Sequence, residues 1–182
     1  MIVEPLQIPD VLLITPKKFA DDRGYFIETW EQKRYAAHGI PTSFVQDNLS
    51  HSVKGTLRGI HYQVRQAQGK LVRVVAGEIF DVAVDMRRSS PTFGQWVGTT
   101  LSADTAQQMW IPEGFAHAFY VTTEFAIFEY KCTDYYAPEH ERCIRWDDPD
   151  LGIEWPLGAG GGPLLSGKDA SAPGLAEAET CE

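Results

Sequence analysis

The sequence predicts an all-β protein: a jelly roll of two facing sheets, with a few short helices. Segments in which apolar and polar residues alternate recur along the chain, which is the pattern of strands with one buried face. Turns rich in Gly, Pro and Asp separate these segments at about the 8–12-residue spacing that is typical of sandwiches and barrels. One segment, Glu31–His38, has the pattern of a short helix, with an acidic first residue and Gly39 as its C-terminal stop.

Each strand is expected where residues alternate or where a short apolar run lies between turn residues. In chain order, the expected strands are Val11–Thr15, Tyr25–Trp30, Phe44–Leu49, Thr56–Gln63, Lys70–Ala76, Glu78–Met86, Gln95–Leu101, Gln108–Ile111, Ala118–Thr122, Phe125–Thr133 and Arg142–Trp146. The most regular alternation, Glu78–Met86, predicts a half-buried strand. Pro16–Gly24 is expected to be a charged loop, and Gly158–Gly162 (GAGGG) a flexible one.

The composition is that of one globular domain. The chain has 182 residues, of which 43% are hydrophobic and 12% aromatic, enough for a sizeable core. We expect the domain to span residues 1–169, followed by a mobile acidic tail at 170–182. The net charge of −9 argues against binding to nucleic acid, which needs a basic face. No apolar run approaches the ~20 residues that span a bilayer, and three cysteines without CxxC spacing favour a cytoplasmic protein.

Polar side chains gather in the segment Gly55–Gly77. Its two strands are expected to form a hairpin, joined by a polar turn of Gln and Gly residues. The polar residues of this hairpin are Arg58, His61, Gln63 and Lys70. Any one of them, His61 included, is compatible with a structural role in which its polar atoms are satisfied. Burying all four without partners would be costly, so together they predict a site.

A second segment, Met109–Val121, completes a two-part pattern. Gly55-x5-His61-x-Gln63, followed by Pro112-x-Gly114-x2-His117, matches the frame of the cupin signature, so the chain resembles the cupin barrels. A metal-binding cupin has His, His, Glu and His as ligands. The corresponding residues here are His61, Gln63, Lys70 and His117. An ammonium group repels a cation and offers it no lone pair, so no metal is expected.

Several motifs in one order resemble the dTDP-4-dehydrorhamnose 3,5-epimerase family. They are KFADDRGYFIE (18–28), QDNLS (46–50), LRGIHYQ (57–63), GKLVRVVAG (69–77), IPEGFAHAF (111–119), EYKCTDYY (129–136) and LSGKD (165–169). The resemblance extends from about Pro5 to Asp169. It implies epimerisation at C3 and C5 of dTDP-4-dehydro-6-deoxy-D-glucose, giving dTDP-4-dehydro-L-rhamnose for dTDP-L-rhamnose biosynthesis. Protons are removed next to the C4 ketone, and no cofactor is needed.

The resemblance also implies catalytic roles. His61 is expected to be the base, since an imidazole has a pKa of ~6.5, near the operating pH. Asp169 is expected to orient it. Tyr130 is the expected acid; it alternates with Phe128 and Cys132 on a face predicted to line the barrel, where a nearby cation would assist it. Lys70 is expected to stabilise the negative charge that develops on O4.

The remaining roles concern binding. Arginines fit a diphosphate, and aromatic rings stack on a base. The residues expected to bind substrate are Arg23, Glu28, Gln46, Asn48, Arg58, His117, Phe19, Phe26 and Tyr136. Within this set, Phe26 and Tyr136 are expected to sandwich the thymine, and Gln46 and Asn48 to share one face of their strand. The resemblance further implies a homodimer in which the N-terminal segment crosses to the second subunit, so that the sites are partly shared.

Three alternatives stay open at this point. The first is a mono-epimerase of the same family that inverts only C3 or C5, because both chemistries use the same acid and base. The second is a metal-dependent cupin such as a dioxygenase, which Gln63 and Lys70 disfavour. The third is a non-catalytic module that binds sugar nucleotides, which would have no evident need for Lys70 and Tyr130.

Overall fold

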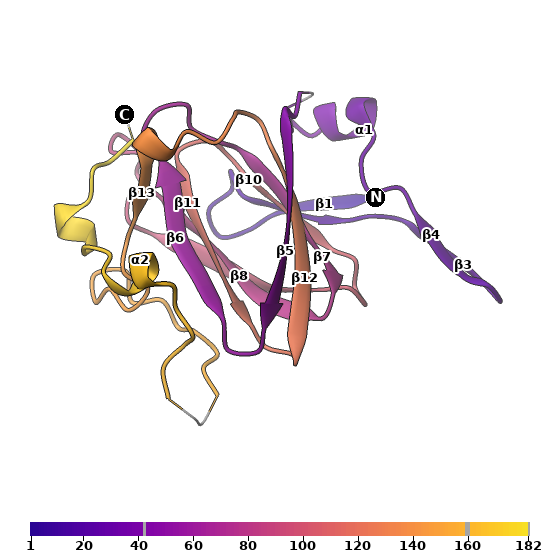
Figure 1. The fold of residues 1–182 in the computed structure, drawn as a ribbon. Coiled ribbons are helices and arrows are strands. Elements are labelled where there is room, and N and C mark those ends of the chain that lie inside the picture. Colours follow the sequence, from indigo (N-terminus) through magenta and orange to yellow (C-terminus); the bar gives the residue numbers. More distant parts are fainter. Residues whose placement is uncertain (42, 159–160, 182) are drawn as a thin grey trace.

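A computed structural model describes residues 1–41, 43–158 and 161–181. Two antiparallel sheets face each other, which confirms the predicted all-β jelly roll (Figure 1). The six-stranded sheet has the order β1 (Ile2–Pro5), β2 (Leu12–Thr15), β10 (Gln108–Ile111), β7 (Lys70–Ala76), β12 (Phe125–Cys132) and β5 (Gln46–Val53). The five-stranded sheet has the order β13 (Glu141–Cys143), β6 (Leu57–Gln63), β11 (Phe115–Val121), β8 (Glu78–Asp85) and β9 (Trp96–Ser102).

Helices are few and short, as predicted. They are α1 (Gln32–Ala36), α2 (Gly167–Ala170) and the 3-10 turns Pro138–His140 and Leu175–Glu177. The side chain of Glu31 caps α1 by accepting from the backbone N–H groups of Lys33 and Arg34. No helix within the described ranges is long and apolar enough to cross a membrane. The GAGGG segment includes residues 159–160, which lie outside the described residues.

The main core fills part of the space between the two sheets. Val72 and Phe128 of the six-stranded sheet pack with Ile79 and Phe119 of the five-stranded sheet, and all four are buried. Each comes from a strand in which every second side chain points inward, so the alternation of apolar residues in the sequence places them in this core. The rest of the space between the sheets is not filled and forms the cavity described below.

The expected hairpin of Thr56–Gln63 and Lys70–Ala76 is wrong. Strand β6 pairs with β11 and β13, whereas β7 pairs with β10 and β12 in the opposite sheet. The polar segment between them crosses from one sheet to the other. Gln63 holds this crossing by donating from Nε2 to the carbonyl of Gln66 at 2.6 Å. The polar residues of the two strands therefore approach one cavity from opposite sides, which a hairpin would not allow.

Strand β8 is buried on both faces, not half-buried as predicted. Its inward Asp81 and Asp85 are fully buried, and its outward Val82 and Val84 are buried too. The outward face is covered by the C-terminal part of the chain, in a cluster that includes Leu151. The alternation in this strand therefore separates two buried faces: one carries the acidic residues and faces inward, and the other packs against a second apolar layer.

The tail after Asp169, predicted to be mobile, lies against the five-stranded sheet (Figure 1). Cys181 is buried and its N–H donates to the carbonyl of Met86 at 3.0 Å. The hydroxyl of Tyr62 on β6 donates to the carbonyl of Glu179 at 2.5 Å. These contacts tie the tail to the end of β8 and to β6, the strand that holds His61. The domain boundary at residue 169 stays a prediction.

The segment Pro16–Gly24, expected to be a loop, contains strand β3 (Lys18–Asp21), which pairs with β4 (Gly24–Ile27). This β3–β4 hairpin extends away from the two main sheets (Figure 1). Its aromatic residues Phe19 and Phe26 are exposed. Alternation fails as a signal in β3 because all four of its residues are exposed, so its apolar residues, Phe19 and Ala20, do not mark a buried face.

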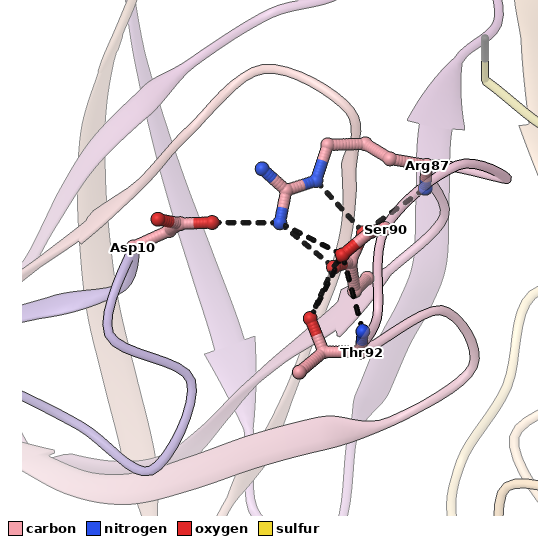
Figure 2. Close-up of polar contacts among 5 residues, drawn as sticks. Asp10, Arg87, Ser90 and Thr92 are labelled. Atoms are coloured by element: carbon pink, nitrogen blue, oxygen red, sulfur yellow. Dashed lines mark hydrogen bonds and ion pairs between the residues drawn. The ribbon is translucent and has the colours of Figure 1, made fainter.

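A polar cluster joins the end of β8 to the N-terminal segment (Figure 2). Arg87 donates from Nη2 to Asp85 at 2.7 Å and to Asp10 at 2.7 Å. Ser90 and Thr92 donate to the same Asp85 carboxylate, each at 2.6 Å. Burial alone would raise the pKa of Asp85, but these hydrogen bonds outweigh it and hold its pKa at about 2.

We expect Asp85→Asn to destabilise the fold by about 3 kcal/mol at pH 7, because it leaves Arg87 beside a buried group without charge. The pKa of Asp85 is lower in the folded chain than in the unfolded one. Its stabilisation is therefore complete above the unfolded pKa of ~3.9 and is lost as the pH falls toward 2. Urea unfolding at pH 7 and pH 3 measures this.

The matched control is Asp147→Asn, which removes the same two-pronged contact with an arginine, Arg145, at the surface. Solvent screens exposed ion pairs, so the control should lose much less stability. Equal losses in the two variants, or a loss in Asp85→Asn that does not shrink at low pH, would contradict the account.

Candidate active site

A cavity of about 560 Å³ lies between the sheets, at the end that the apolar core leaves open. Both sheets and the C-terminal segment contribute to its walls. The polar residues that line it are Asn48, Ser50, Thr56, Arg58, His61, Lys70, His117, Tyr130, Ser166, Lys168 and Asp169. A smaller cavity of about 80 Å³ shares His61, Lys70 and Tyr130 with it and adds Tyr136 and Glu141. The four residues predicted to be catalytic therefore lie together.

His61 and Asp169 form a close pair. His61 Nε2 lies 2.6 Å from Asp169 Oδ1, and the exposed fractions of the two side chains are 30% and 3%. Asp169 is held by α2, where its N–H donates to the side chain of Ser166, the N-cap. Burial would raise the pKa of Asp169, but the hydrogen bond from His61 and smaller contributions lower it below its usual value. A buried carboxylate thus orients a half-exposed imidazole.

Tyr130 faces the cavity from the opposite sheet, as its alternation with Phe128 predicts. Its direct partner on β5 is Asn48. Burial raises the pKa of Tyr130 to about 12. The charge of Arg58 acts in the other direction but does not prevail. The predicted nearby cation is therefore present, but desolvation of the phenolate is the larger cause, and the net pKa shift of Tyr130 is upward.

Lys70 begins β7 and lies beside Tyr130, with its Nζ 6.0 Å from the ring centroid. It is buried, and burial lowers the pKa of its ammonium group, although the nearby Cys132 and Asp81 oppose the shift. Among the described residues, Lys70 Nζ has no hydrogen-bond or ion-pair partner. The side chain does not snorkel to bulk water and points its charge toward the cavity.

His117 has a partner that the sequence analysis missed. Its Nε2 lies 3.1 Å and 3.0 Å from the two carboxylate oxygens of Asp81, which is fully buried on β8. Burial raises the pKa of Asp81 and lowers that of His117, and the charge of each partner opposes the shift of the other. An Asp in an otherwise apolar alternating strand was the available signal, because such a residue needs a buried partner.

The predicted binding residues divide into two groups, of which the first lies at the two cavities or, for Gln46, is hydrogen-bonded to residues that line them. Gln46 donates to Asn48 at 3.0 Å, which confirms that they share a face, and its Oε1 accepts from the N–H of Tyr136. Arg58 donates to Ser52 at 3.0 Å. The Tyr136 hydroxyl donates to Glu141 at 2.7 Å.

Glu141 and Lys168 are two further polar residues that the sequence analysis missed. They form an ion pair, so the hydroxyl of Tyr136 is linked through Glu141 to the helix that holds Asp169. Burial would raise the pKa of Glu141, but the contacts with Lys168 and Tyr136 lower it. Lys168 is part of the LSGKD motif, so its position near Asp169 could be predicted from the sequence. Its pairing with Glu141 could not.

The second group lies on or beside the β3–β4 hairpin and does not reach the cavity of its own chain. Arg23 donates from Nη2 to Asp21 at 2.6 Å and is exposed. Glu28 forms an ion pair with Arg34 on α1. Phe19 and Phe26 face each other with ring centroids 6.5 Å apart. Their predicted roles in substrate binding have no support from contacts within one chain.

The residues at the cupin ligand positions do not fit a metal. Gln63 donates from Nε2 to the carbonyls of Gln66 and Tyr135, and its Oε1 accepts from the N–H of Ala137 at 2.8 Å. Its amide is thus fully used by the backbone. Lys70 has no lone pair when charged, and His117 is paired with Asp81. No metal chemistry is assigned to these positions.

Comparison with known proteins identifies the family. The chain matches the model of the dTDP-4-dehydrorhamnose 3,5-epimerase family over residues 5–177. The chain belongs to this family. A protein of that name from Pseudomonas aeruginosa is 61% identical over 175 residues, which cover 96% of each chain. A dTDP-4-dehydrorhamnose 3-epimerase from Streptomyces niveus is 42% identical over 180 residues, covering 98% of this chain and 86% of the relative.

A solved structure is also closely similar. It is the dTDP-6-deoxy-D-glucose-3,5-epimerase of Legionella pneumophila in complex with dTDP-4-keto-L-rhamnose. The TM-score is 0.94 at 54% sequence identity, and the match covers 97% of this chain and 94% of the other. The resemblance inferred from the sequence motifs is therefore confirmed for the fold and for the family.

Proposed function

We propose that this chain epimerises C3 and C5 of dTDP-4-dehydro-6-deoxy-D-glucose, giving dTDP-4-dehydro-L-rhamnose in dTDP-L-rhamnose biosynthesis. The main support is the cavity, in which an imidazole–carboxylate pair on one side lies opposite a phenol on the other. Membership of the epimerase family and the 61% identical relative of that name support it further. Both carbons are next to the C4 ketone, so each can lose a proton to give an enolate.

His61 removes the proton. Its Nε2 is engaged by Asp169, so Nδ1 is the ring nitrogen left to accept a proton from the substrate. Asp169 fixes this tautomer and stabilises the imidazolium that forms. A base placed in this way contributes about 10²–10⁴-fold to the rate. The hydrogen bond to Asp169 also keeps the ring from rotating away between the two epimerisations.

Tyr130 returns a proton to the opposite face of the sugar. Strands β6 and β12 belong to facing sheets, so a ring held between them has His61 on one side and Tyr130 on the other. Inversion requires this arrangement, because the proton must leave one face and arrive at the other. The high pKa of Tyr130 keeps its proton in place until a strongly basic carbanion forms. Lys70 stabilises the negative charge on O4 in the meantime.

The nucleotide is bound beside the catalytic groups, where Arg58 and Asn48 line the large cavity and Tyr136 lines the smaller one. Arg58 offers a planar fork of donors to the diphosphate. Gln46 and Asn48 offer amide groups, and the exposed ring of Tyr136 offers a face on which thymine stacks. Base–aromatic stacking contributes about 1–3 kcal/mol per base. His117, held by Asp81, completes the polar wall beside Lys70.

The active form is a homodimer in which the β3–β4 hairpin supplies Arg23, Glu28, Phe19 and Phe26 to the partner's cavity. Two observations support this. The hairpin extends away from its own barrel and exposes its aromatic side chains (Figure 1). The outer face of the six-stranded sheet also exposes a row of apolar side chains, namely Leu49, Val53, Val75 and Phe125. A partner that covers this face would bury them.

We also place the protein in the cytoplasm. The three cysteines, Cys132, Cys143 and Cys181, are all free and buried, which suits a reducing compartment. A reducing compartment keeps Cys143, which lies beside Asp169, in its thiol form. Fractionation of the source cells with an antibody against the protein tests this placement, and recovery from a secreted or membrane fraction would overturn it.

Incubation with dTDP-4-dehydro-6-deoxy-D-glucose in D2O tests the proposed reaction. We expect the product to carry one deuteron at C3 and one at C5, because each carbon is reprotonated from groups in exchange with solvent. NMR of the product counts both. Failure to exchange either hydrogen at saturating substrate would refute the proposal.

The same experiment separates the main alternative. The Streptomyces niveus relative is named a 3-epimerase, so a single inversion is a chemistry found within the family. A mono-epimerase would give an inverted centre and a deuteron at one carbon only. Because the general acid and base are the same for both reactions, the count of inverted centres is decisive, and sequence likeness is not.

A further inference from the structure

Three potential metal ligands meet beside the cavity, in a set that shares only His61 with the cupin ligand positions. They are His61 Nε2, Cys143 Sγ and Asp169 Oδ1, and these atoms lie within 4.8 Å of one another. They come from three elements: β6, β13 and α2. Cys143 is the direct strand partner of His61, so the backbone ladder itself places the thiol next to the imidazole.

We propose that His61, Cys143 and Asp169 form an inhibitory site for a thiophilic divalent cation, with Zn²⁺ as its natural occupant. Imidazole, thiolate and carboxylate are each common zinc ligands, and three protein ligands with a fourth position open to solvent are typical of accessible zinc sites. Zn²⁺ is therefore favoured here over Mg²⁺ or Ca²⁺, which prefer all-oxygen ligand sets.

The spacing of the three atoms suits a tetrahedral ion after a small adjustment. With a Zn–S bond of ~2.3 Å and Zn–N and Zn–O bonds of ~2.0 Å, the ligand atoms should lie about 3.3–3.5 Å apart. Cys143 Sγ is 3.7 Å from Asp169 Oδ1, which is close to this value. His61 Nε2 and Asp169 Oδ1 are 2.6 Å apart, so that pair must open by about 0.7 Å. His61 is half-exposed, so its ring has room to move.

Access to the site is also provided. His61 and Asp169 both line the large cavity, so an ion can enter from there and its fourth ligand can be a water molecule. Asp169 additionally borders a second hollow, next to Arg145 and Ala170.

The thiol of Cys143 is buried, and burial raises its pKa to about 12. Without a metal, Cys143 is thus an inert thiol that donates weakly to Asp169.

Binding would remove the base from catalysis. Cys143 loses its thiol proton to solvent as the Zn–S bond forms. The proton on His61 Nε2 is replaced by the metal and is taken up at Nδ1, so one proton is released per ion in total. Nδ1 is the nitrogen that the proposed mechanism uses to accept the substrate proton, and it is then already protonated. The inhibition rests on the proposed function, whereas the binding does not.

Cobalt(II) and zinc titrations test the binding. Co²⁺ bound to a thiolate gives a charge-transfer absorption in the near ultraviolet, which neither histidine nor carboxylate ligands produce. We expect this band in the wild-type protein, at one ion per chain, and its loss when Zn²⁺ is added. Cys143→Ser should abolish the band and weaken Zn²⁺ binding by more than about 100-fold, since loss of a ligand exceeds the usual effect of changing its supporting residues.

Cys181→Ser is the matched control. Cys181 is also a buried thiol, but among the described residues the one hydrogen bond of its sulfur is to the carbonyl of Gln63, at 3.8 Å. This variant should keep both the band and the affinity. Thermal melting of each variant reports whether it folds, and Cys143→Ala replaces Cys143→Ser if the serine variant does not. A wild-type protein without the band, or a folded Cys143 variant with unchanged Zn²⁺ affinity, would overturn the site.

Rate measurements with and without Zn²⁺ test the inhibition separately. We expect micromolar free Zn²⁺ to suppress epimerisation by the wild-type protein and by Cys181→Ser, while the rate of a Cys143 variant changes little relative to its own metal-free rate. If the wild-type protein binds Zn²⁺ at this site but its rate is unaffected, the inhibitory role is wrong and the epimerase function stands. If no epimerisation occurs at all, the proposed function fails and the cobalt band still decides the site.

Discussion

Replacing His61 with alanine is expected to lower kcat by about 10³-fold, within the 10²–10⁴-fold range of a well-placed general base. The reason is that His61 is paired with a buried carboxylate and lines the cavity opposite Tyr130. Water cannot replace it in the same geometry. The measurements are kcat under saturating substrate and the rate at which deuterium enters C3 and C5 in D2O. Both should fall together, because each reports proton removal.

The control for this change is His38→Ala. His38 is an exposed histidine just after α1 and is not among the residues that line the cavity, so its loss should change kcat by less than about twofold. A His61→Ala protein that keeps a third of the wild-type rate would show that another group removes the proton. In that case His117, with Asp81 behind it, would be the next group to test.

The His61→Ala variant also tests whether sites are shared between subunits. Arg23→Ala is expected to be weakly active by itself, because it removes a cation supplied by the hairpin. In a mixed dimer of His61→Ala and Arg23→Ala chains, one site has both changes and the other has neither. Mixing equal amounts of the two impaired proteins under conditions that exchange subunits should therefore restore about a quarter of the wild-type activity, since half of the dimers are mixed and each of these has one intact site. No recovery would argue that each chain builds its own complete site.

Much of this arrangement could be predicted from the sequence, because the chemistry follows local patterns. The alternation of Phe128, Tyr130 and Cys132 correctly placed the phenol on the inward face. The motif LSGKD correctly indicated that Asp169 pairs with His61, although 108 residues separate the two. In that case a family resemblance supplied what no local pattern contains, since neither residue type nor spacing links the two positions.

The errors have a common physical cause: partners that are distant in sequence. A polar turn between two strands favours a hairpin locally, but pairing of β6 with β11 and of β7 with β10 prevails over it. Likewise, the C-terminal tail looks mobile by composition, yet it covers apolar residues of β8 that otherwise would be exposed. The roles of Cys143 and Asp81 could not be predicted either, because only the fold places Cys143 beside His61 and Asp81 beside His117.

Replacing Lys70 with methionine is expected to lower kcat by about 10²–10³-fold, equivalent to about 3–4 kcal/mol of lost stabilisation of the oxyanion. The methionine side chain has similar length and suits a buried position, so the fold should be kept. KM should change little, because the charge on O4 develops only after the substrate is bound. The matched control is Lys33→Met on α1, which removes the same charge from an exposed position and should leave kcat within about twofold of wild type.

The pH dependence of kcat makes the test of Lys70 specific. Burial lowers the pKa of Lys70, and the enzyme needs its ammonium form, so kcat of the wild type should fall at a pH below the ordinary lysine pKa of ~10.4. Tyr130 must also stay protonated, but its pKa of about 12 puts its own loss at higher pH. The first alkaline decline therefore belongs to Lys70, and Lys70→Met should lack it. If the variant keeps that decline, or keeps kcat within threefold of wild type, then another group stabilises the charge on O4. Arg58 would be the next group to test, because it is the remaining cation without an ion-pair partner among the described residues that line the large cavity.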